Sequence, residues 1–211
     1  MKALVVTGGN PPNLELLKEY SRKANLIIGA DKGCDYLYEG KIKPDYILGD
    51  FDSAHKETIK YFKVLGVEEN KYKKEKDDTD TKIAVDLAIS KGAKEIYILG
   101  ATGTRVDHVL SNLGLMLLGL KYSVTVEIID EYNRILLTDK NLNIKGNKGD
   151  IVSFHAYSEV VEGLTIKGAK YELNNYNLYL GDGITTSNEF IDKDIEITFN
   201  KGKLIIIYSK D

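Results

Sequence analysis

Short aliphatic runs alternate with helix-length amphipathic segments over much of this chain, and this alternation restricts its fold more than any other feature. Five runs have the length and composition of buried strands, at residues 4–6, 26–28, 46–48, 96–99 and 124–129. Amphipathic segments lie between them, at 13–23, 33–39, 55–65, 80–91 and 106–120. Strands that alternate with helices of this length predict an α/β fold: a mainly parallel, Rossmann-like sheet with helices on both faces.

The remainder of the chain lacks helical periodicity and shows short segments of alternating polarity, at 134–138, 151–155, 164–167 and 194–200. Between Ile195 and Phe199 the apolar residues occupy alternate positions, as in a half-buried strand. Asn200–Lys203 predicts a hairpin turn into a further strand over Leu204–Tyr208. We therefore predict an amino-terminal α/β domain over residues 1–133 and a carboxy-terminal all-β sandwich domain over residues 134–211.

Charge and cysteine content exclude several classes of protein. The 29 basic and 32 acidic residues give a net charge of −3, which argues against a general nucleic-acid binder and a basic membrane-surface protein. Cys34 is the single cysteine, so the chain has neither an intrachain disulfide nor a cysteine metal cluster. The apolar segment Val106–Tyr122 is interrupted by polar residues and is too short to predict a membrane span. We expect a cytoplasmic protein.

Polar clusters follow four of the predicted strands, and a fifth precedes the helix at 80–91. They are Gly8–Asn10, Asp31–Gly33, Gly49–Ser53, Gly100–His108 and Asp78–Asp80. Because open parallel sheets bind ligands beyond the carboxyl ends of their strands, these clusters predict a single ligand site.

Asp50 and Asp52 are the most specific feature among the polar clusters at the carboxyl ends of the strands. Residues two apart in an extended stretch point the same way, so both carboxylates can face one Mg²⁺ ion shared with substrate phosphates. The alternative is a solvated turn in which the aspartates accept hydrogen bonds from the backbone. Asp78–Asp80 likewise has two interpretations, as a helix cap or as the source of a third carboxylate facing the metal.

The glycine-rich turn 100–105 leads directly into a predicted helix, an arrangement that favours anion binding. Arg105 adds a guanidinium suited to phosphate oxygens, and Asp107 and His108 are placed to cap the helix or orient neighbours. The chain has neither a Walker A motif nor a complete G-x-G-x-x-G fingerprint, which counts against P-loop kinases and ordinary dinucleotide enzymes.

The motifs, in this order along the chain, resemble those of the thiamine pyrophosphokinase family. They are Ala30–Gly33, Gly49–Ser53, Asp78–Asp80, Gly100–His108 and Thr186–Asn188. The resemblance extends over essentially the whole chain. It implies an enzyme that transfers the diphosphate group of ATP to the hydroxyl of thiamine, giving thiamine diphosphate and AMP.

Carried over residue by residue, the resemblance implies a set of roles. The metal ligands for Mg²⁺ are Asp50, Asp52 and Asp80, and these residues act in catalysis together with Arg105 and Asp107. The ATP-binding residues are Asp31, Asp50, Thr79, Gly100, Gly103 and Arg105. Thiamine is held by Tyr171, Ser187 and Asn188, with Tyr171 as the nearest counterpart of an aromatic residue that stacks on the vitamin in some members. The family also implies a homodimer with shared active sites.

Two alternatives stay open from the residues alone. One is another Mg²⁺-dependent transferase that uses a nucleotide, and the other is a catalytically silent module that binds a nucleotide or thiamine. Release of AMP together with transfer of both the β and γ phosphates distinguishes the implied reaction from both.

Overall fold

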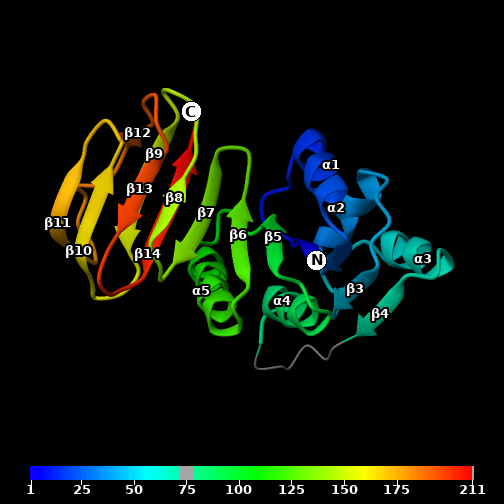
Figure 1. The fold of residues 1–211 in the computed structure, drawn as a ribbon. Helices are drawn as coiled ribbons and strands as arrows, with labels where there is room; N and C mark the ends of the chain where they lie inside the picture. Colours follow the sequence, from blue (N-terminus) through cyan, green and yellow to red (C-terminus); the bar gives the residue numbers. More distant parts are fainter. Residues whose placement is uncertain (72–77, 211) are drawn as a thin grey trace. The chain divides into compact units, whose positions relative to one another are not determined.

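The computed structural model describes residues 1–71 and 78–210 and divides into two compact units, Met1–Glu131 and Tyr132–Asp211. The first unit contains a parallel sheet of strand order β6-β5-β1-β2-β3-β4 (Figure 1). Its strands are β1 (Lys2–Val6), β2 (Leu26–Ala30), β3 (Tyr46–Gly49), β4 (Glu68–Lys71), β5 (Glu95–Leu99) and β6 (Thr125–Ile129). Its helices are α1 (Leu14–Lys23), α2 (Gly33–Glu39), α3 (Lys56–Val64), α4 (Asp80–Ser90) and α5 (Val106–Tyr122).

The alternation of side chains along β1 explains why both faces of this sheet are covered. Leu4 and Val6 belong to a core cluster that includes Leu17 of α1, Leu37 of α2 and Phe62 of α3. The intervening side chains of the strand are also fully buried and point to the opposite face. On that face α4 packs against β1, β2 and β3, and α5 packs against α4 and β6. The predicted combination of a parallel sheet with helices is therefore confirmed for this unit.

β4 is a strand of this unit that the sequence did not predict. Its residues, Glu68-Glu69-Asn70-Lys71, contain no aliphatic side chain, and it pairs with β3 at the end of the strand order. An edge strand needs little apolar surface and has no hydrophobic run by which to recognise it.

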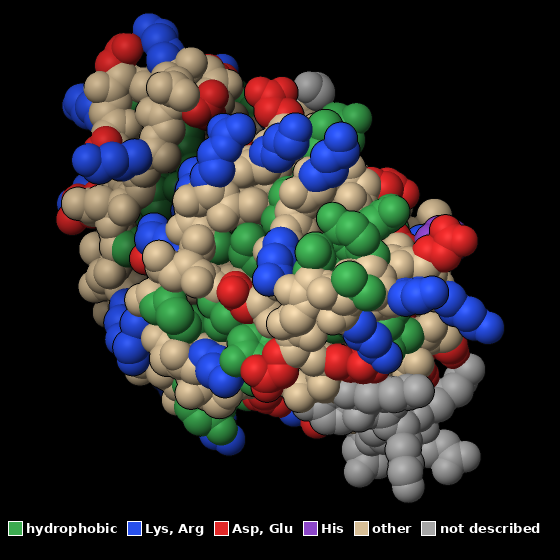
Figure 2. Space-filling model, turned by 90° about the vertical axis from the view of Figure 1, so that its right-hand side faces the viewer, with side chains coloured by type: hydrophobic (Ala, Val, Ile, Leu, Met, Phe, Trp, Pro, Cys, Tyr) green, Lys and Arg blue, Asp and Glu red, His purple; other side chains and the backbone are tan. Residues whose placement is uncertain are grey.

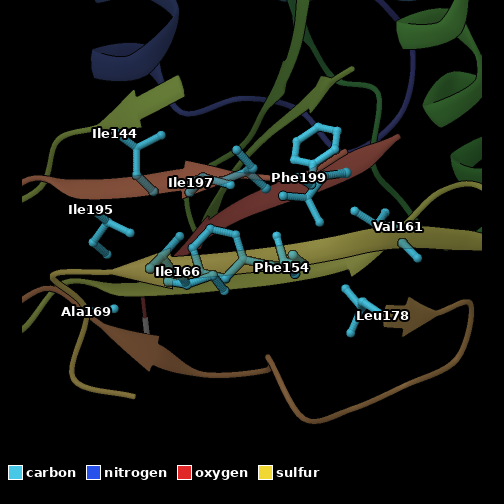
Figure 3. Close-up of a cluster of buried hydrophobic side chains, with 14 of the residues drawn as sticks. Ile144, Phe154, Val161, Ile166, Ala169, Leu178, Ile195, Ile197 and Phe199 are labelled. Atoms are coloured by element: carbon cyan, nitrogen blue, oxygen red, sulfur yellow. The ribbon is translucent and has the colours of Figure 1, made fainter. Parts of the chain in front are cut away.

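The second unit contains antiparallel strands in two groups, ordered β12-β9-β14-β7 and β11-β10-β13-β8. The strands are β7 (Asn133–Thr138), β8 (Leu142–Ile144), β9 (Ile151–Ala156), β10 (Val160–Lys167), β11 (Leu173–Tyr179), β12 (Asn188–Glu189), β13 (Ile195–Thr198) and β14 (Leu204–Ser209). Apolar side chains from both groups form one buried cluster, which includes Phe154, Val161, Ile166 and Ile197 (Figure 3). The predicted all-β character of this unit is confirmed.

The hairpin predicted across Asn200–Lys203 is wrong. β13 pairs with β8 and β10, whereas β14 pairs with β7 and β9, so the turn passes from one group of strands to the other. Lys201 instead forms an isolated antiparallel bridge with Glu162. Alternating polarity identifies a strand and its buried face, but the choice of partner strand depends on contacts distant in the sequence.

Charged side chains of both signs are interspersed on the face of the molecule shown in Figure 2. This distribution agrees with the near balance of 29 basic and 32 acidic residues. Among the described residues, no helix combines the length and apolar character needed to cross a bilayer.

Two glycines of α5 provide a matched test of helix packing. A Cβ at Gly114 would meet no atom within 4 Å, whereas a Cβ at Gly119 would lie 2.6 Å from the Val124 carbonyl oxygen and 2.7 Å from Val126 Cγ2. We expect Gly114→Ala to raise the free energy of unfolding by about 0.5–1 kcal/mol, because alanine restricts the unfolded chain and favours the helix.

Gly119→Ala gains the same helix propensity but overpacks the contact with β6, so we expect a net loss of about 1–2 kcal/mol. Urea titration of both variants measures the difference. Equal effects of the two substitutions would contradict close packing of α5 at Gly119.

Candidate active site

The loops that follow β1, β2, β3 and β5 surround a cavity of about 520 Å³ in the first unit. The start of α4 and the start of α5 complete its wall. The lining residues are Thr7, Gly8, Gly9, Asn10, Asp31, Lys32, Ser53, Thr79, Asp80, Thr81, Gly100, Ala101, Thr102, Gly103, Thr104, Arg105, His108, Val109 and Asn112. The clusters predicted to share one edge of the sheet thus meet around one cavity, as expected for an open parallel sheet.

One wall consists of two loops joined through their backbones. The Gly9 N–H donates to the Gly100 carbonyl and the Asn10 N–H donates to the Thr102 carbonyl, each at 2.7 Å. A Cβ at Gly9 would lie 2.2 Å from the Thr102 oxygen, and one at Gly100, where φ is +71°, would lie 2.1 Å from the Thr7 oxygen. Glycine is therefore required for these loops to approach each other.

Buried hydrogen bonds hold this wall from beneath. The Asn112 amide donates to the Ala101 carbonyl at 2.8 Å, and the Tyr36 hydroxyl donates to the Gly9 carbonyl at 2.8 Å. The hydroxyls of Thr7 and Thr81 share a further hydrogen bond of 2.9 Å. Side chains from α2, α4 and α5 thus fix the loops, so this wall is rigid before any ligand binds.

Asp31 lines the cavity and belongs to an acidic cluster, defined here as Asp31, Asp50 and Asp52, whose other two members are not among the lining residues. Each residue offers a carboxylate oxygen, and these oxygens lie within 4.8 Å of one another. The Asp52 N–H donates to Asp50 Oδ1 at 2.9 Å, which is the backbone contact of the turn interpretation. Phe51, between the two aspartates, has φ of +58°, a conformation rare for a bulky residue. The turn and the convergence of carboxylates are therefore both present.

Asp31 is a partly buried member of the cluster and lies in the field of other carboxylates. Burial raises the pKa of its carboxyl group, the Ser53 hydroxyl that donates to Oδ2 opposes this rise, and the charges of Asp80, Asp50 and Asp52 add to it. Its other oxygen, Oδ1, is buried and accepts no hydrogen bond from the described residues. A buried carboxylate oxygen without a donor is costly unless a cation or a proton compensates it.

The donor set therefore fits a hard divalent cation. Carboxylate oxygens are the ligands that Mg²⁺ and Ca²⁺ prefer, and an ion beside Asp31 Oδ1 would satisfy that atom and offset the repulsion within the cluster. The sequence predicted Asp31 as a nucleotide-binding residue, and the structure places its carboxylate among those of Asp50 and Asp52.

Asp80 and Thr79 lie at the start of α4. Thr79 is the N-cap, and its hydroxyl accepts from the Lys82 N–H at 3.2 Å, so the capping interpretation holds for this residue. Asp80 follows it in the chain. Its Oδ1 would lie 3.3 Å from a Cβ placed on Gly49, the residue before Asp50, so its carboxylate faces the acidic cluster. Both residues also line the cavity. Asp78 instead pairs with Lys82 at 2.9 Å.

Arg105 and Asp107 form an exposed ion pair at the start of α5. The guanidinium donates to the two carboxylate oxygens at 2.5 and 3.2 Å. Hydrogen bonding within the pair raises the pKa of Arg105 and lowers that of Asp107. Arg105 lines the cavity. Asp107, which pairs with its guanidinium, is not a lining residue. No side-chain cap satisfies the first turn of α5.

Lys32 is a candidate residue that the sequence reasoning missed. It lies at the start of α2, is exposed and lines the cavity next to Asp31. Within the described part of the chain it forms no ion pair, unlike Arg105. Its position directly after Asp31, at the end of a predicted strand, was the available signal. An ammonium here is placed to meet an anionic ligand.

The three predicted thiamine residues lie together in the second unit. Asn188 is 3% exposed, and its amide accepts from the Tyr171 N–H at 3.0 Å and donates to the Tyr171 carbonyl at 2.7 Å. Tyr171 is 61% exposed, with Lys170 Nζ 5.6 Å from the centre of its ring. Ser187, with φ of +56°, donates its N–H to Ser153 Oγ at 2.9 Å. The buried amide of Asn188 thus fixes the backbone from which an exposed aromatic ring projects.

The unfavourable charge of Asp31 predicts that replacing its carboxylate with a neutral side chain stabilises the folded chain. Because burial raises its folded pKa, the ionised carboxylate costs stability above that raised value, and the cost disappears below the unfolded pKa of about 4. In metal-free buffer we expect Asp31→Asn to unfold at a higher temperature than the parent chain at pH 7, with the difference vanishing near pH 4.

Asp107→Asn is the matched control, because the pKa of Asp107 is lowered and its removal brings no such gain. Calorimetry with a chelator present measures both variants. A lower unfolding temperature for Asp31→Asn at pH 7 would contradict the uncompensated charge.

Comparisons with known proteins identify the family. The protein-family model described as "Thiamin pyrophosphokinase, catalytic domain" matches residues 17–128. The family model described as "Thiamin pyrophosphokinase, vitamin B1 binding domain" matches residues 135–204. The thiamine pyrophosphokinase of Bacillus subtilis is 36% identical over 215 aligned residues, which span all of both chains.

Solved structures agree with this match over the whole chain. A crystal structure of thiamine pyrophosphokinase from Bacillus subtilis superposes with a TM-score of 0.89 at 35% identity and covers all of both chains. One from Geobacillus thermodenitrificans gives 0.87 at 29% identity, covering all of this chain and 98% of the other. With both units matched and a relative 36% identical over its full length, the chain belongs to the thiamine pyrophosphokinase family.

Proposed function

We propose that this chain transfers the diphosphate group of ATP to the hydroxyl of thiamine, forming thiamine diphosphate and AMP. The observation that carries the proposal is the cavity of the first unit, whose lining includes hydrogen-bonded glycine loops and Asp31, a member of an acidic cluster suited to a metal ion. Membership of the thiamine pyrophosphokinase family supplies the substrates. This combination favours the transferase over a silent binding module, which has no need of clustered carboxylates.

In this reaction the thiamine hydroxyl oxygen attacks the β-phosphorus of ATP, the bond from that phosphorus to the oxygen of AMP breaks, and the hydroxyl proton is lost. Negative charge is spread over the phosphoryl oxygens, so catalysis depends on positioning and charge neutralisation. At an effective dielectric constant of 20, each carboxylate about 4 Å from a phosphate charge would repel it by about 4 kcal/mol. The acidic cluster therefore binds phosphates only with a cation between them.

We assign Asp50, Asp52 and Asp80 as ligands of Mg²⁺, and the geometry adds Asp31. When bound, Mg²⁺ would neutralise phosphate oxygens and draw the diphosphate toward the cluster. Family membership makes a metal-dependent kinase the expectation, and the orphaned oxygen of Asp31 supports a cation at this point.

The remaining roles belong to residues on the other sides of the cavity. Lys32 and Arg105 supply positive charge to phosphate oxygens, and Asp107 holds the Arg105 guanidinium in a defined orientation. Gly100 and Gly103 give the phosphates close access to the backbone, and Thr79 fixes the start of α4 beside Asp80. These contacts position the nucleotide for transfer.

We propose that the second unit binds thiamine. Tyr171 offers an exposed ring to the cationic thiazolium, a contact worth about 0.5–2 kcal/mol. Asn188 acts chiefly through Tyr171, since both ends of its amide are bonded to that backbone, and Ser187 lies beside it. By this proposal the first unit is a Rossmann-like catalytic domain and the second a β-sandwich whose strand groups enclose the shared core.

We further propose a cytoplasmic homodimer in which the α/β domain of one subunit and the β domain of the other form each active site. The separation of roles supports it: the residues proposed for ATP lie in the first unit and those for thiamine in the second. The single cysteine suits a reducing compartment.

Labelled ATP tests the reaction. With Mg²⁺ and thiamine present, we expect equimolar AMP and thiamine diphosphate, with both the β and γ phosphorus atoms transferred. Asp52→Asn should lower turnover by about 100-fold or more while the chain stays folded, because it removes a ligand charge from the metal. ADP as the nucleotide product would indicate a different transferase, and ligand binding without AMP would indicate a binding module.

Mixing two impaired variants tests the shared site. Asp52→Asn disables the α/β domain and Tyr171→Ala weakens the β domain, so a heterodimer would combine both defects in one site and leave the other intact. We expect recovery of about a quarter of the parent activity after statistical exchange, since half the dimers would each hold one sound site. Mass spectrometry of the intact dimers confirms exchange. No recovery despite exchange would place each site within one chain.

A further inference from the structure

A buried carboxylate outside the acidic cluster holds the loop that carries Asp50 and Asp52. Asp35 lies in α2 and is 2% exposed. The His55 N–H donates to its two oxygens at 3.1 and 3.2 Å, and His55 Nδ1 lies 2.9 Å from Oδ2. In the described part of the chain, every hydrogen bond to the Asp35 carboxylate comes from His55.

These contacts are one of two ties between the segment that follows β2 and the loop between β3 and α3. One turn earlier, Asp31 accepts a hydrogen bond from the Ser53 hydroxyl. Residues 31 and 35 belong to the segment that follows β2, and residues 53 and 55 belong to the loop between β3 and α3. Two carboxylates of the segment after β2 therefore hold two residues of the loop that carries Asp50 and Asp52. Figure 1 shows α2 beside α3.

The loop needs such an anchor because its conformation is unfavourable by itself. Phe51 has φ of +58°, and the loop places two aspartates close to the charge of Asp31. Phe51 and Ala54 pack partly against the core cluster, which fixes the apolar side of the loop. The polar end is fixed at His55, which also stands at the N-cap position of α3.

We propose that Asp35 and His55 are positioning residues for the metal site: they hold the carboxylates of Asp50 and Asp52 in place through the loop, without contacting the metal. The inference rests on the proposed function for the identity of that site. The partners that orient metal ligands typically contribute about tenfold to hundredfold in metal affinity. The role assigned to both residues acts through the loop, by the contacts between Asp35 and His55.

Binding of Mn²⁺ to the full chain, followed by electron paramagnetic resonance, tests the inference without turnover. Mn²⁺ takes the same oxygen ligands as Mg²⁺, and competition by Mg²⁺ identifies the shared site. We expect His55→Ala to weaken Mn²⁺ binding about threefold to tenfold and Asp35→Ala to weaken it about tenfold or more, because the second removes both contacts. His55→Asn, which keeps a side-chain donor, should restore most of the affinity.

Gly119→Ala is the control for stability alone. Gly119 lies near the end of α5, where an added Cβ would press on Val124 and Val126, so the variant destabilises the same unit without changing a contact of Asp35 or of the loop. It should bind Mn²⁺ as the parent chain does. In steady state, His55→Ala should need more Mg²⁺ for half-maximal rate while kcat at saturating Mg²⁺ stays near the parent value.

Four outcomes test the inference. Parent-like Mn²⁺ affinity in folded His55→Ala and Asp35→Ala would overturn the inference, as would equal weakening in Gly119→Ala. Absence of Mg²⁺-competed Mn²⁺ binding in the parent chain would overturn it together with the metal assignment. Weakened binding in the two variants with no thiamine diphosphate formed by the parent would support the positioning role and refute the proposed function.

Discussion

Repulsion between carboxylates at the carboxyl edge of the parallel sheet is the constraint on which the candidate site depends. Asp31, Asp50 and Asp52 converge within 4.8 Å, and the charge of Asp80 also acts on Asp31. Such a cluster is unfavourable in the folded chain alone, so the fold must force these groups together. It does so with positive φ at Asp31 and Phe51 and with the two ties from the segment after β2, one to Ser53 and one to His55. The strain resides where a cation and phosphates would relieve it.

The parallel topology explains why so much of this site could be read from the sequence. Each of β1, β2, β3 and β5 is a short aliphatic run, so its end is visible, and parallel strands bring their ends to the same edge. The polar clusters that follow these runs were therefore expected to meet, and they line one cavity. The spacing of Asp50 and Asp52 indicated that their carboxylates could face one ion, with a solvated turn as the alternative, and the structure contains both the convergence and the turn.

What the sequence did not predict depends on contacts between residues far apart in the chain. The tie between Asp35 and His55 spans twenty positions and has no periodic signal, and the placement of Asp31 among the cluster requires the pairing of β2 with β3. In the second unit, β11 is recognisable only from its pairing with β10, since most of its side chains face solvent. The partner of β14 was misassigned because alternation defines a face and leaves the neighbouring strand undetermined.

The backbone pairing of Gly9 with Gly100 and of Asn10 with Thr102 has a consequence for the entropy of ligand binding. Loops that close over phosphates often become ordered only when the ligand arrives, and that ordering reduces affinity. Here the two loops already restrain each other, and Asn112 and Tyr36 hold them from below. A phosphate chain entering the cavity would meet a surface whose conformational freedom was lost during folding. The entropic cost of association then falls mainly on the flexible triphosphate, and the protein contributes a preorganised wall.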